Sequence, residues 1–205
     1  MDFLNFAFSG YGGKIITREE VTKRSLILPE VLENIPERCE CGGEVGFSSD
    51  LREAVCLNPK CFYKTAERLG GMAEAMGVMG FDKWTCIRIC KEFKLESPFT
   101  AFLVESKDRG LNKRLTALKE SRSRECNLVE MAEYSGIPLI ADNAETLFRK
   151  VGSIEQFYGG IIGERVRECY RNGVGLSEIS VALQESKEEL MLGEQVFWIR
   201  GRNGR

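Results

Sequence analysis

Four of the eight cysteines in this sequence lie close together and have the spacing of metal ligands. Cys39 and Cys41 form a C-x-C pair, and Cys56 and Cys61 form a C-x4-C pair fourteen residues further on. Two such pairs on two turns place four thiolates around one tetrahedral zinc ion. The chain contains no histidine, so a mixed site is excluded. We predict a structural zinc site, with buried cysteines that hold no metal as the alternative.

The residues beside these pairs favour tight turns. Gly42-Gly43 follows the first pair and Asn58-Pro59 lies inside the second, and both sequences favour turns. A metal would replace the core that so short a segment cannot build for itself. The single residue between Cys39 and Cys41 is one fewer than in the usual zinc knuckle, which predicts some strain at this end. Cys86, Cys90, Cys126 and Cys169 are expected to be small buried side chains.

The composition limits the class of protein to which the chain can belong. The 205 residues are 43% hydrophobic and 29% charged, the balance of a globular protein. The sequence has no apolar run long enough to cross a bilayer, and no basic leader precedes its apolar start. We therefore expect a cytoplasmic protein, in the host cytoplasm if a phage encodes it. In that reducing compartment, clustered cysteines favour metal binding over disulfides.

The net charge of −2 argues against a protein that binds nucleic acid through bulk positive charge. Any DNA contact must therefore be local. A basic stretch lies between residues 107 and 124, for which a solvated helix face is the simplest interpretation. Its cations are Lys107, Arg109, Lys113, Arg114, Lys119, Arg122 and Arg124.

Beyond the cysteines, three units repeat a scheme of helix, glycine turn and helix. The first spans residues 64–77 and 84–93, with Asp82 as the N-cap of its second helix. The second pairs a helix at 127–134 with one that carries Ala144, Leu147 and Phe148 on one face, joined by the turn 135–142.

The third unit places Gly160 and Gly163 just before a helix that carries Val166, Cys169 and Tyr170. A glycine turn that leads into a helix presents free amides, which bind phosphate without side-chain charge. The predicted phosphate contacts are Gly160, Gly163, Arg165 and Arg167, followed by Lys83 and Arg88 in the first unit. The alternatives are that the turns are mere connectors and that the cations are ordinary surface residues.

The order of these parts resembles the C-terminal half of bacterial NAD-dependent DNA ligases. The similarity spans about residues 27–175. It includes LILPEVLENIPERCECGG, which resembles the family's apolar strand with an Ile-Pro step, and CLNPKCF at 56–62. TALKESR at 116–122 and LFRKVGSI at 147–154 match two further family segments.

The resemblance implies a mainly α fold, in which a helix-hairpin-helix body carries a small four-cysteine zinc-finger β module near its N-terminus. Two packed pairs of helical hairpins are expected to bury their apolar faces against each other. We expect four divisions. Residues 1–36 form an N-terminal segment that could be a remnant of the oligonucleotide-binding barrel, and residues 37–63 form the finger. Residues 64–175 form the helical domain, and residues 176–205 form a C-terminal helix and tail.

Two family features limit what this chain does alone. The K-x-D-G motif, whose lysine accepts AMP from NAD, does not occur in the sequence. Adenylation would therefore belong to a partner chain, and NAD would enter only through that partner. The segment LMLGEQVFWIRGRNGR resembles the first strand of the family's BRCT domain.

Two functions follow from the resemblance. In the first, the chain is the non-catalytic subunit of a split NAD-dependent DNA ligase, of the kind found among bacteriophages. It would clamp nicked double-stranded DNA by its backbone, while a nucleotidyltransferase chain seals the nick. In the second, it is a non-enzymatic module acting in replication, transcription or host interaction through protein contacts. Asp82, Leu139 and Ala141 stand where the family has turn glycines, which favours the second.

Overall fold

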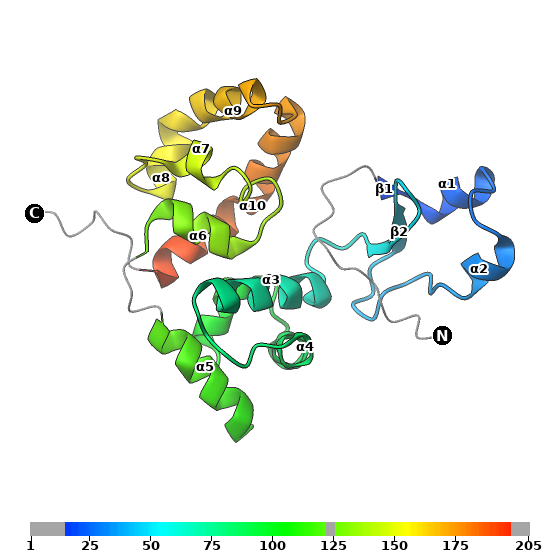
Figure 1. Ribbon diagram of the computed structural model, residues 1–205, viewed down its shortest axis with the longest axis horizontal. Coiled ribbons are helices and arrows are strands. Elements are labelled where there is room, and N and C mark those ends of the chain that lie inside the picture. The colour runs from blue at the N-terminus through cyan, green and yellow to red at the C-terminus, as the bar shows by residue number, and fades with distance from the viewer. Residues whose placement is uncertain (1–14, 122–125, 198–205) are drawn as a thin grey trace, which may run out of the picture.

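The computed structural model describes residues 15–121 and 126–197 and is mainly helical, with one small sheet. Figure 1 shows the sheet and two short helices as one module beside a larger helical body. The predicted fold class is confirmed at this level: a mostly α protein with a cysteine-bearing β module near its N-terminus. Among the described residues, no helix combines the length and apolarity that a bilayer-spanning segment needs.

The sheet has three antiparallel strands in the order β1-β2-β3, namely Ile15–Ile16, Val45–Ser48 and Ala54–Cys56. Pairing of Val45 with Cys56 places the second cysteine pair at the end of the sheet. Because β1 pairs with β2, the segment that precedes the finger joins this sheet. Residues 1–14, the rest of the predicted barrel remnant, lie outside the described residues.

Two short helices, α1 (Arg18–Lys23) and α2 (Pro29–Glu33), connect β1 to the first cysteines. The Arg18 guanidinium donates to the carbonyl oxygens of Leu32 at 2.6 Å and Ile35 at 2.9 Å, which holds α1 against the end of α2. The expected apolar strand in this region is wrong. Pro29 at the first helical position has a backbone angle that starts a helix, and it has no N–H to give to a sheet.

The first helix pair of the body is α3 (Phe62–Ala75) and α4 (Lys83–Phe93), which pack closely on each other. Asp82 is confirmed as the N-cap of α4: its carboxylate accepts from the Thr85 amide at 3.0 Å and from the Thr85 hydroxyl at 3.0 Å. The turn between the helices contains Gly77 and Gly80, both with positive φ.

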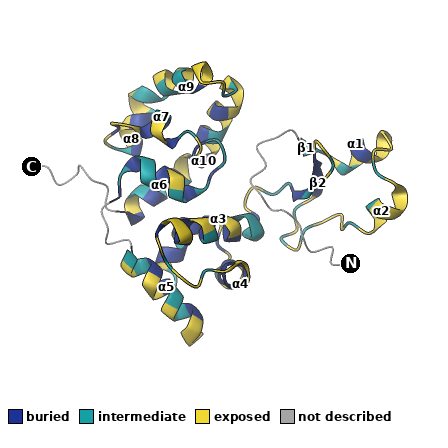
Figure 2. Cartoon of the chain, in the orientation of Figure 1, coloured by how far each residue is buried: buried dark blue, intermediate teal, exposed yellow. Residues whose placement is uncertain are grey.

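Two elements follow this pair: η1 (Pro98–Leu103), a 3-10 helix, and α5 (Arg109–Ser121). One stripe of α5 is buried, formed by Leu111, Leu115 and Leu118, and it packs on η1. Helix α5 also carries four cations of the basic stretch: Arg109 and Lys113 are exposed, and Arg114 and Lys119 are half-buried. Figure 2 shows exposed positions along this helix.

The second helix pair is α6 (Leu128–Ser135) and α7 (Ala144–Phe148). Asn127 caps α6 in a capping box with Glu130. In the connecting turn, Gly136 and Leu139 have φ values of +59° and +63°. Leu139 thus has the left-handed conformation, at a position where the ligase family that the sequence resembles has a turn glycine.

The third predicted unit is not a hairpin. The segments α8 (Ile154–Gln156), η2 (Phe157–Ile161) and α9 (Ile162–Arg171) follow one another without a break, and η2 is a π-helical turn. Gly160 lies in η2 and Gly163 in α9, so the glycine turn expected there is wrong. Phe157 and Val166 of this segment are buried, and their packing outweighs the low helix propensity of the glycines.

The chain then forms its longest helix, α10 (Leu176–Val196). The C-terminal helix expected within residues 176–205 is present, and it includes residues 190–196 of the segment that resembles a BRCT strand. Residues 198–205 lie outside the described part. Helix α10 approaches the body so closely that a Cβ atom at Gly193 would lie 2.7 Å from the Phe99 ring. Phe197 then packs edge-on against Phe99 and Phe102, with centroid distances of 5.9 and 5.3 Å.

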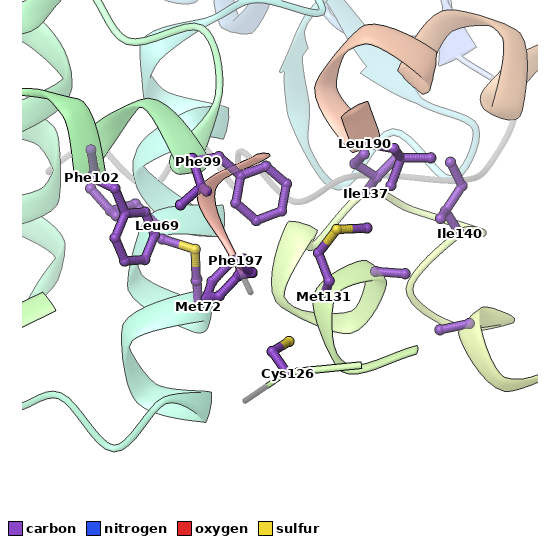
Figure 3. Close-up of a cluster of buried hydrophobic side chains, with 14 of the residues drawn as sticks. Leu69, Met72, Phe99, Phe102, Cys126, Met131, Ile137, Ile140, Leu190 and Phe197 are labelled. Atoms are coloured by element: carbon purple, nitrogen blue, oxygen red, sulfur yellow. The ribbon is translucent and has the colours of Figure 1, made fainter. Parts of the chain in front are cut away.

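The core lies where the helix pairs meet. Helix α3 contacts α6 and η1, and α10 contacts α6 and η1. Figure 3 shows Leu69 and Met72 of α3, Met131 of α6 and Leu190 of α10 around the Phe99–Phe197 contact. These side chains are fully or almost fully buried. Helix α3 of the first pair thus packs on α6 of the second. The structure does not confirm the expected two packed pairs of helical hairpins, because the third unit forms no hairpin.

Candidate metal centre

The four cysteines predicted as metal ligands meet at one point between β3 and α3. Their sulfur atoms all lie within 4.8 Å of one another. The Cys39 and Cys61 sulfurs are 3.8 Å apart, and the Cys41 and Cys56 sulfurs are 3.5 Å apart. A tetrahedral zinc ion with Zn–S bonds of about 2.3 Å needs sulfurs about 3.8 Å apart. The arrangement therefore matches a four-thiolate shell.

The first pair is held by a tight turn. The Cys39 amide donates to the Gly43 carbonyl at 2.8 Å, and the Gly42 amide donates to the Cys39 carbonyl at 2.8 Å. Gly42 has a φ of +83°, which a side chain would strain. A Cβ atom at Gly43 would lie 2.6 Å from Asn58 Cβ and 2.9 Å from Cys56 Sγ. Glycine at 43 thus lets the two cysteine turns approach each other.

The second pair closes the site against the start of α3. The Lys60 amide donates to Asn58 Oδ1 at 2.9 Å, while Asn58 Nδ2 points to Cys41 Sγ at 3.6 Å. Cys61 is the N-cap of α3. The positive end of the helix therefore faces this thiol. A thiolate bound to a metal would be stabilised there.

The thiols of Cys41, Cys56 and Cys61 differ in how readily they ionise. Burial opposes ionisation of Cys41, yet hydrogen bonds from the Gly43 amide, Cys56 and Asn58 together lower its pKa to about 7. Burial raises the pKa of Cys56 to about 11 and also raises the pKa of Cys61. A site with one easily ionised thiol and two buried ones favours a bound cation, which stabilises the remaining thiolates.

The donor set fits a structural metal ion. All four ligand positions are sulfur, Cys56 and Cys61 are buried, and Cys39 and Cys41 are half-buried. A closed four-sulfur shell leaves no open position for a substrate or a reactive water. The chemistry that this arrangement supports is cross-linking of the N-terminal module to α3, not catalysis.

The cysteine turn is also attached to the helical body through charge. Glu40, between the first two ligands, forms an ion pair with Lys91 of α4. The Lys91 ammonium lies 5.0 Å from the Phe62 ring centroid and 5.1 Å from that of Tyr63. A second ion pair joins Lys60 to Glu96 at 2.6 Å. The metal site therefore sits at the junction of the two parts.

The predicted phosphate contacts in the third unit are held by the protein itself. Arg165 donates to Glu168 at 3.0 Å and to the Arg149 carbonyl at 2.9 Å, and only 21% of its side chain is exposed. Arg167 donates to the Gly163 carbonyl at 2.9 Å. Since Gly163 lies inside α9, the structure does not bring these residues together as an amide-lined turn.

The first helix pair offers a better-formed cationic site. Lys83 is exposed at the first turn of α4, and Arg88 pairs with Asp108 at 3.3 Å. The turn residue Gly80 has a φ of +90°, and a Cβ atom there would lie 3.0 Å from Arg114 Nε. Arg114 of α5 thus lies against the glycine turn. In the sequence, Arg114 is only one cation of a basic stretch. Its contact with Gly80 joins two segments that are distant in the sequence, so no local pattern predicts it.

The remaining cysteines are structural, as expected. Cys86, Cys90, Cys126 and Cys169 are all buried. Burial raises the pKa of Cys86 to about 12 and that of Cys90 to about 12, so both thiols stay protonated. They act as small core side chains.

Comparisons with known proteins assign this chain to no family. No protein-family model matches the chain, and a search of curated proteins found no significant match.

Proposed function

We propose that this chain is the non-catalytic DNA-binding subunit of a split NAD-dependent DNA ligase. The four cysteines would bind zinc, and the helical body would contact the sugar–phosphate backbone of nicked duplex DNA without reading its sequence. A partner chain would carry the adenylation lysine and use NAD. This chain would add affinity and position the nick.

The observation that carries the proposal is the contact between Arg114 and the turn of the first helix pair. A left-handed glycine allows close approach of a phosphate to the backbone. The guanidinium that lies against Gly80 supplies a cation at the same place. A phosphate that docks on this turn would meet both backbone and charge.

Neighbouring cations extend this surface. Among the described residues, no carboxylate lies within ion-pairing distance of Lys83, Lys107, Arg109 or Lys113. All four are exposed. The first is on α4 and the others are in or just before α5. We name Lys83, Arg109, Lys113 and Arg114 the α5 basic surface.

One feature of the turn opposes anion binding. Hydrogen bonds from Thr85 lower the pKa of Asp82, so its carboxylate stays charged beside the turn. The Asp82 carboxylate caps α4, and the positive charge of Arg114 partly offsets its negative charge. The affinity for DNA is therefore expected to be modest and to depend on the partner chain.

A second function, as a module that works through protein contacts, is supported by exposed apolar residues. In the N-terminal module, Leu28 is 68% and Val31 45% exposed, and Leu26 is 40% exposed. In α4, Trp84 is 67% exposed. Surface residues of this size are common at protein interfaces.

The test uses the full chain loaded with zinc. Fluorescence anisotropy would measure its binding to a nicked duplex and to the same duplex without the nick, over a range of salt concentrations. Four phosphate contacts predict a slope of about −3.6 in a plot of log affinity against log salt. A chain with K-x-D-G from the same genome should seal nicks faster when this chain is added. Binding without salt dependence, together with no effect on sealing, would refute the ligase function.

A further inference from the structure

A groove runs between α3 and α4, and the turn that joins them closes one end. Its volume is about 620 Å³, within the range of sites that bind ligands or side chains of a partner. Its walls are mainly apolar. They include Ala66, Val78, Met79, Phe81, Cys86 and Ile87. Met79 is the most exposed of these, at 89%.

Two glycines inside α3 keep this groove open. Gly70 and Gly71 both line it, although glycine weakens a helix interior. A Cβ atom at Gly71 would meet nothing within 4 Å, and one at Gly70 would make only ordinary contacts, 3.6 Å from Cys86 Sγ and 3.7 Å from the Phe81 carbonyl. No neighbour within the chain therefore requires glycine at either position. A bare helix surface does allow an external backbone to approach closely.

The rim of the groove is acidic. Glu67, Glu74 and Asp82 line it against one cation, Lys83. Among the described residues, neither Glu67 nor Glu74 forms an ion pair. They lie two turns apart on α3, which separates them by about 10.5 Å along the helix axis. Both carboxylates are exposed, so each is open to a cation that arrives with a partner.

We propose that this groove binds an amphipathic helix of a partner protein, with Lys or Arg at two positions seven residues apart and leucine-sized residues between them. The spacing of the two cations matches Glu67 and Glu74 on a parallel or antiparallel neighbour. The apolar residues between them fill the floor, and the bare stretch at Gly70 and Gly71 admits the backbone. The partner helix becomes a third helix beside α3 and α4.

Charge selects this occupant over nucleic acid. Three carboxylates around an apolar floor repel phosphate, so DNA would avoid this groove. The groove and the α5 basic surface adjoin: Lys83 and Gly80 line the groove, and Met79 borders both the groove and a small depression with Gly110, Lys113 and Arg114. Glu67, Gly71 and Glu74 are not part of the α5 basic surface, so protein binding at these residues does not depend on the DNA-binding proposal.

The probe is a fluorescent helical peptide with two lysines seven positions apart and leucines between them, titrated against the zinc-loaded chain. Two changes test the site: Gly71→Leu, which fills the groove, and the double change Glu67→Lys with Glu74→Lys. The matched control is Gly159→Leu, because Gly159 is also helical and exposed and a Cβ atom there also meets nothing within 4 Å. Thermal unfolding and metal content verify that each variant folds.

We expect Gly71→Leu and the double change each to weaken peptide binding at least tenfold, and Gly159→Leu to leave it unchanged. A second peptide, with glutamates in place of the lysines, should bind the double Lys variant and not the original chain. Equal binding by Gly71→Leu and the original chain would overturn the proposal, as would stronger binding of the acidic peptide to the original chain. Sedimentation that shows a dimer lost in Gly71→Leu would identify a second copy as the occupant and overturn it as well. Affinity of Gly71→Leu for nicked DNA should stay the same, which separates this result from the DNA-binding test.

Discussion

The carboxylate of Glu40 and the ammonium of Lys91 form an ion pair that joins the cysteine turn to the first helix pair. Glu40 stands between two of the candidate metal ligands, and Lys91 lies in α4 above the rings of Phe62 and Tyr63. A metal ion bound at the cysteines would therefore be linked to the position of α4. A change in the cysteine turn should therefore alter the position of α4, and a change in α4 should alter metal affinity.

Replacing Lys91 by methionine keeps the packing on Phe62 and removes the charge. Both partners are about half exposed, so we expect a loss of only about 0.5 kcal/mol in the free energy of unfolding. Metal content should stay at one ion per chain. Limited proteolysis should become faster near residues 57–62, where the two parts meet. Loss of the metal in this variant would show that the ion pair is part of the site itself.

The same pair predicts how stability responds to pH. The hydrogen bond from Lys91 lowers the pKa of Glu40, and the bond to Glu40 raises the pKa of Lys91. The Glu40 contribution is complete above the ordinary carboxyl pKa and is lost as pH falls through the lowered one. The Lys91 contribution is complete below the ordinary ammonium pKa and is lost as pH rises through the raised one. The stability difference between the original chain and Lys91→Met should thus be constant from about pH 5 to about pH 9.

Removal of the metal should unfold the N-terminal module and leave most of the helical body folded. The sheet has three short strands, and the module buries few large apolar side chains, so a metal ion held by the four cysteines would supply much of its stability. Elemental analysis should find one zinc per chain, and cobalt substitution should give the absorption of a four-thiolate site. Cys56→Ser should lose the metal. Cys90→Ala, which removes a buried thiol elsewhere, should cost about 1 kcal/mol and keep it.

Glycine at position 43 is required by the distance between the two cysteine turns. In Gly43→Ala the new methyl group would lie 2.6 Å from Asn58 Cβ and 2.9 Å from Cys56 Sγ. Overpacking of this kind costs about 1–3 kcal/mol, which corresponds to roughly a fivefold to 150-fold loss of metal affinity. Gly71→Ala is the matched control, since its methyl group meets nothing within 4 Å and the φ of Gly71 is not positive. Competition with a colorimetric chelator measures both. Equal affinities would mean that the turns can move apart freely.

Local patterns predicted the features that depend on neighbouring residues. The four cysteines, the Asp82 cap and the helices of the first two pairs follow from spacing, capping and helical periodicity. Leu139 shows where such reasoning needs the structure. A leucine with positive φ is unfavourable by itself, but its partly buried side chain packs against the core, which supports this conformation.

Features that depend on contacts between distant segments could not be predicted. Gly160 and Gly163 suggest a turn when read locally, yet the burial of Phe157 and Val166 against the rest of the body keeps this segment helical. The position of Arg114 against Gly80 brings together residues from α5 and the first turn, which no local pattern reveals. The groove between α3 and α4 likewise exists only once the two helices have packed.

A half-buried ion pair should contribute more to stability than the surface pairs. Arg68 of α3 pairs with Glu189 of α10 and also donates to the Ser135 carbonyl at 2.7 Å. The Ser97 hydroxyl donates to the same glutamate at 2.6 Å. Glu189→Ala leaves a guanidinium that is 17% exposed without its charge partner, and we expect a loss of about 2 kcal/mol by urea denaturation. A double-mutant cycle with Arg68→Met isolates the pair, and an interaction energy near zero would contradict this assignment.

The location of the DNA contact can be decided by two matched charge reversals. Arg109→Glu with Lys113→Glu changes two exposed cations of the α5 basic surface that have no ion-pair partner among the described residues. Arg165→Glu with Arg167→Glu makes the same change of net charge in α9, where both arginines are already bound to protein groups. If the α5 surface contacts phosphate, the first change should reduce the salt slope of nicked-duplex binding by about 1.8, at about 0.9 for each lost contact. The second should leave the slope unchanged, although it costs stability because Arg165 caps the Arg149 carbonyl. A slope that changes with the α9 reversal and not with the α5 reversal would place the DNA contact in the third unit. The reason is that only residues that displace counterions from DNA alter the slope.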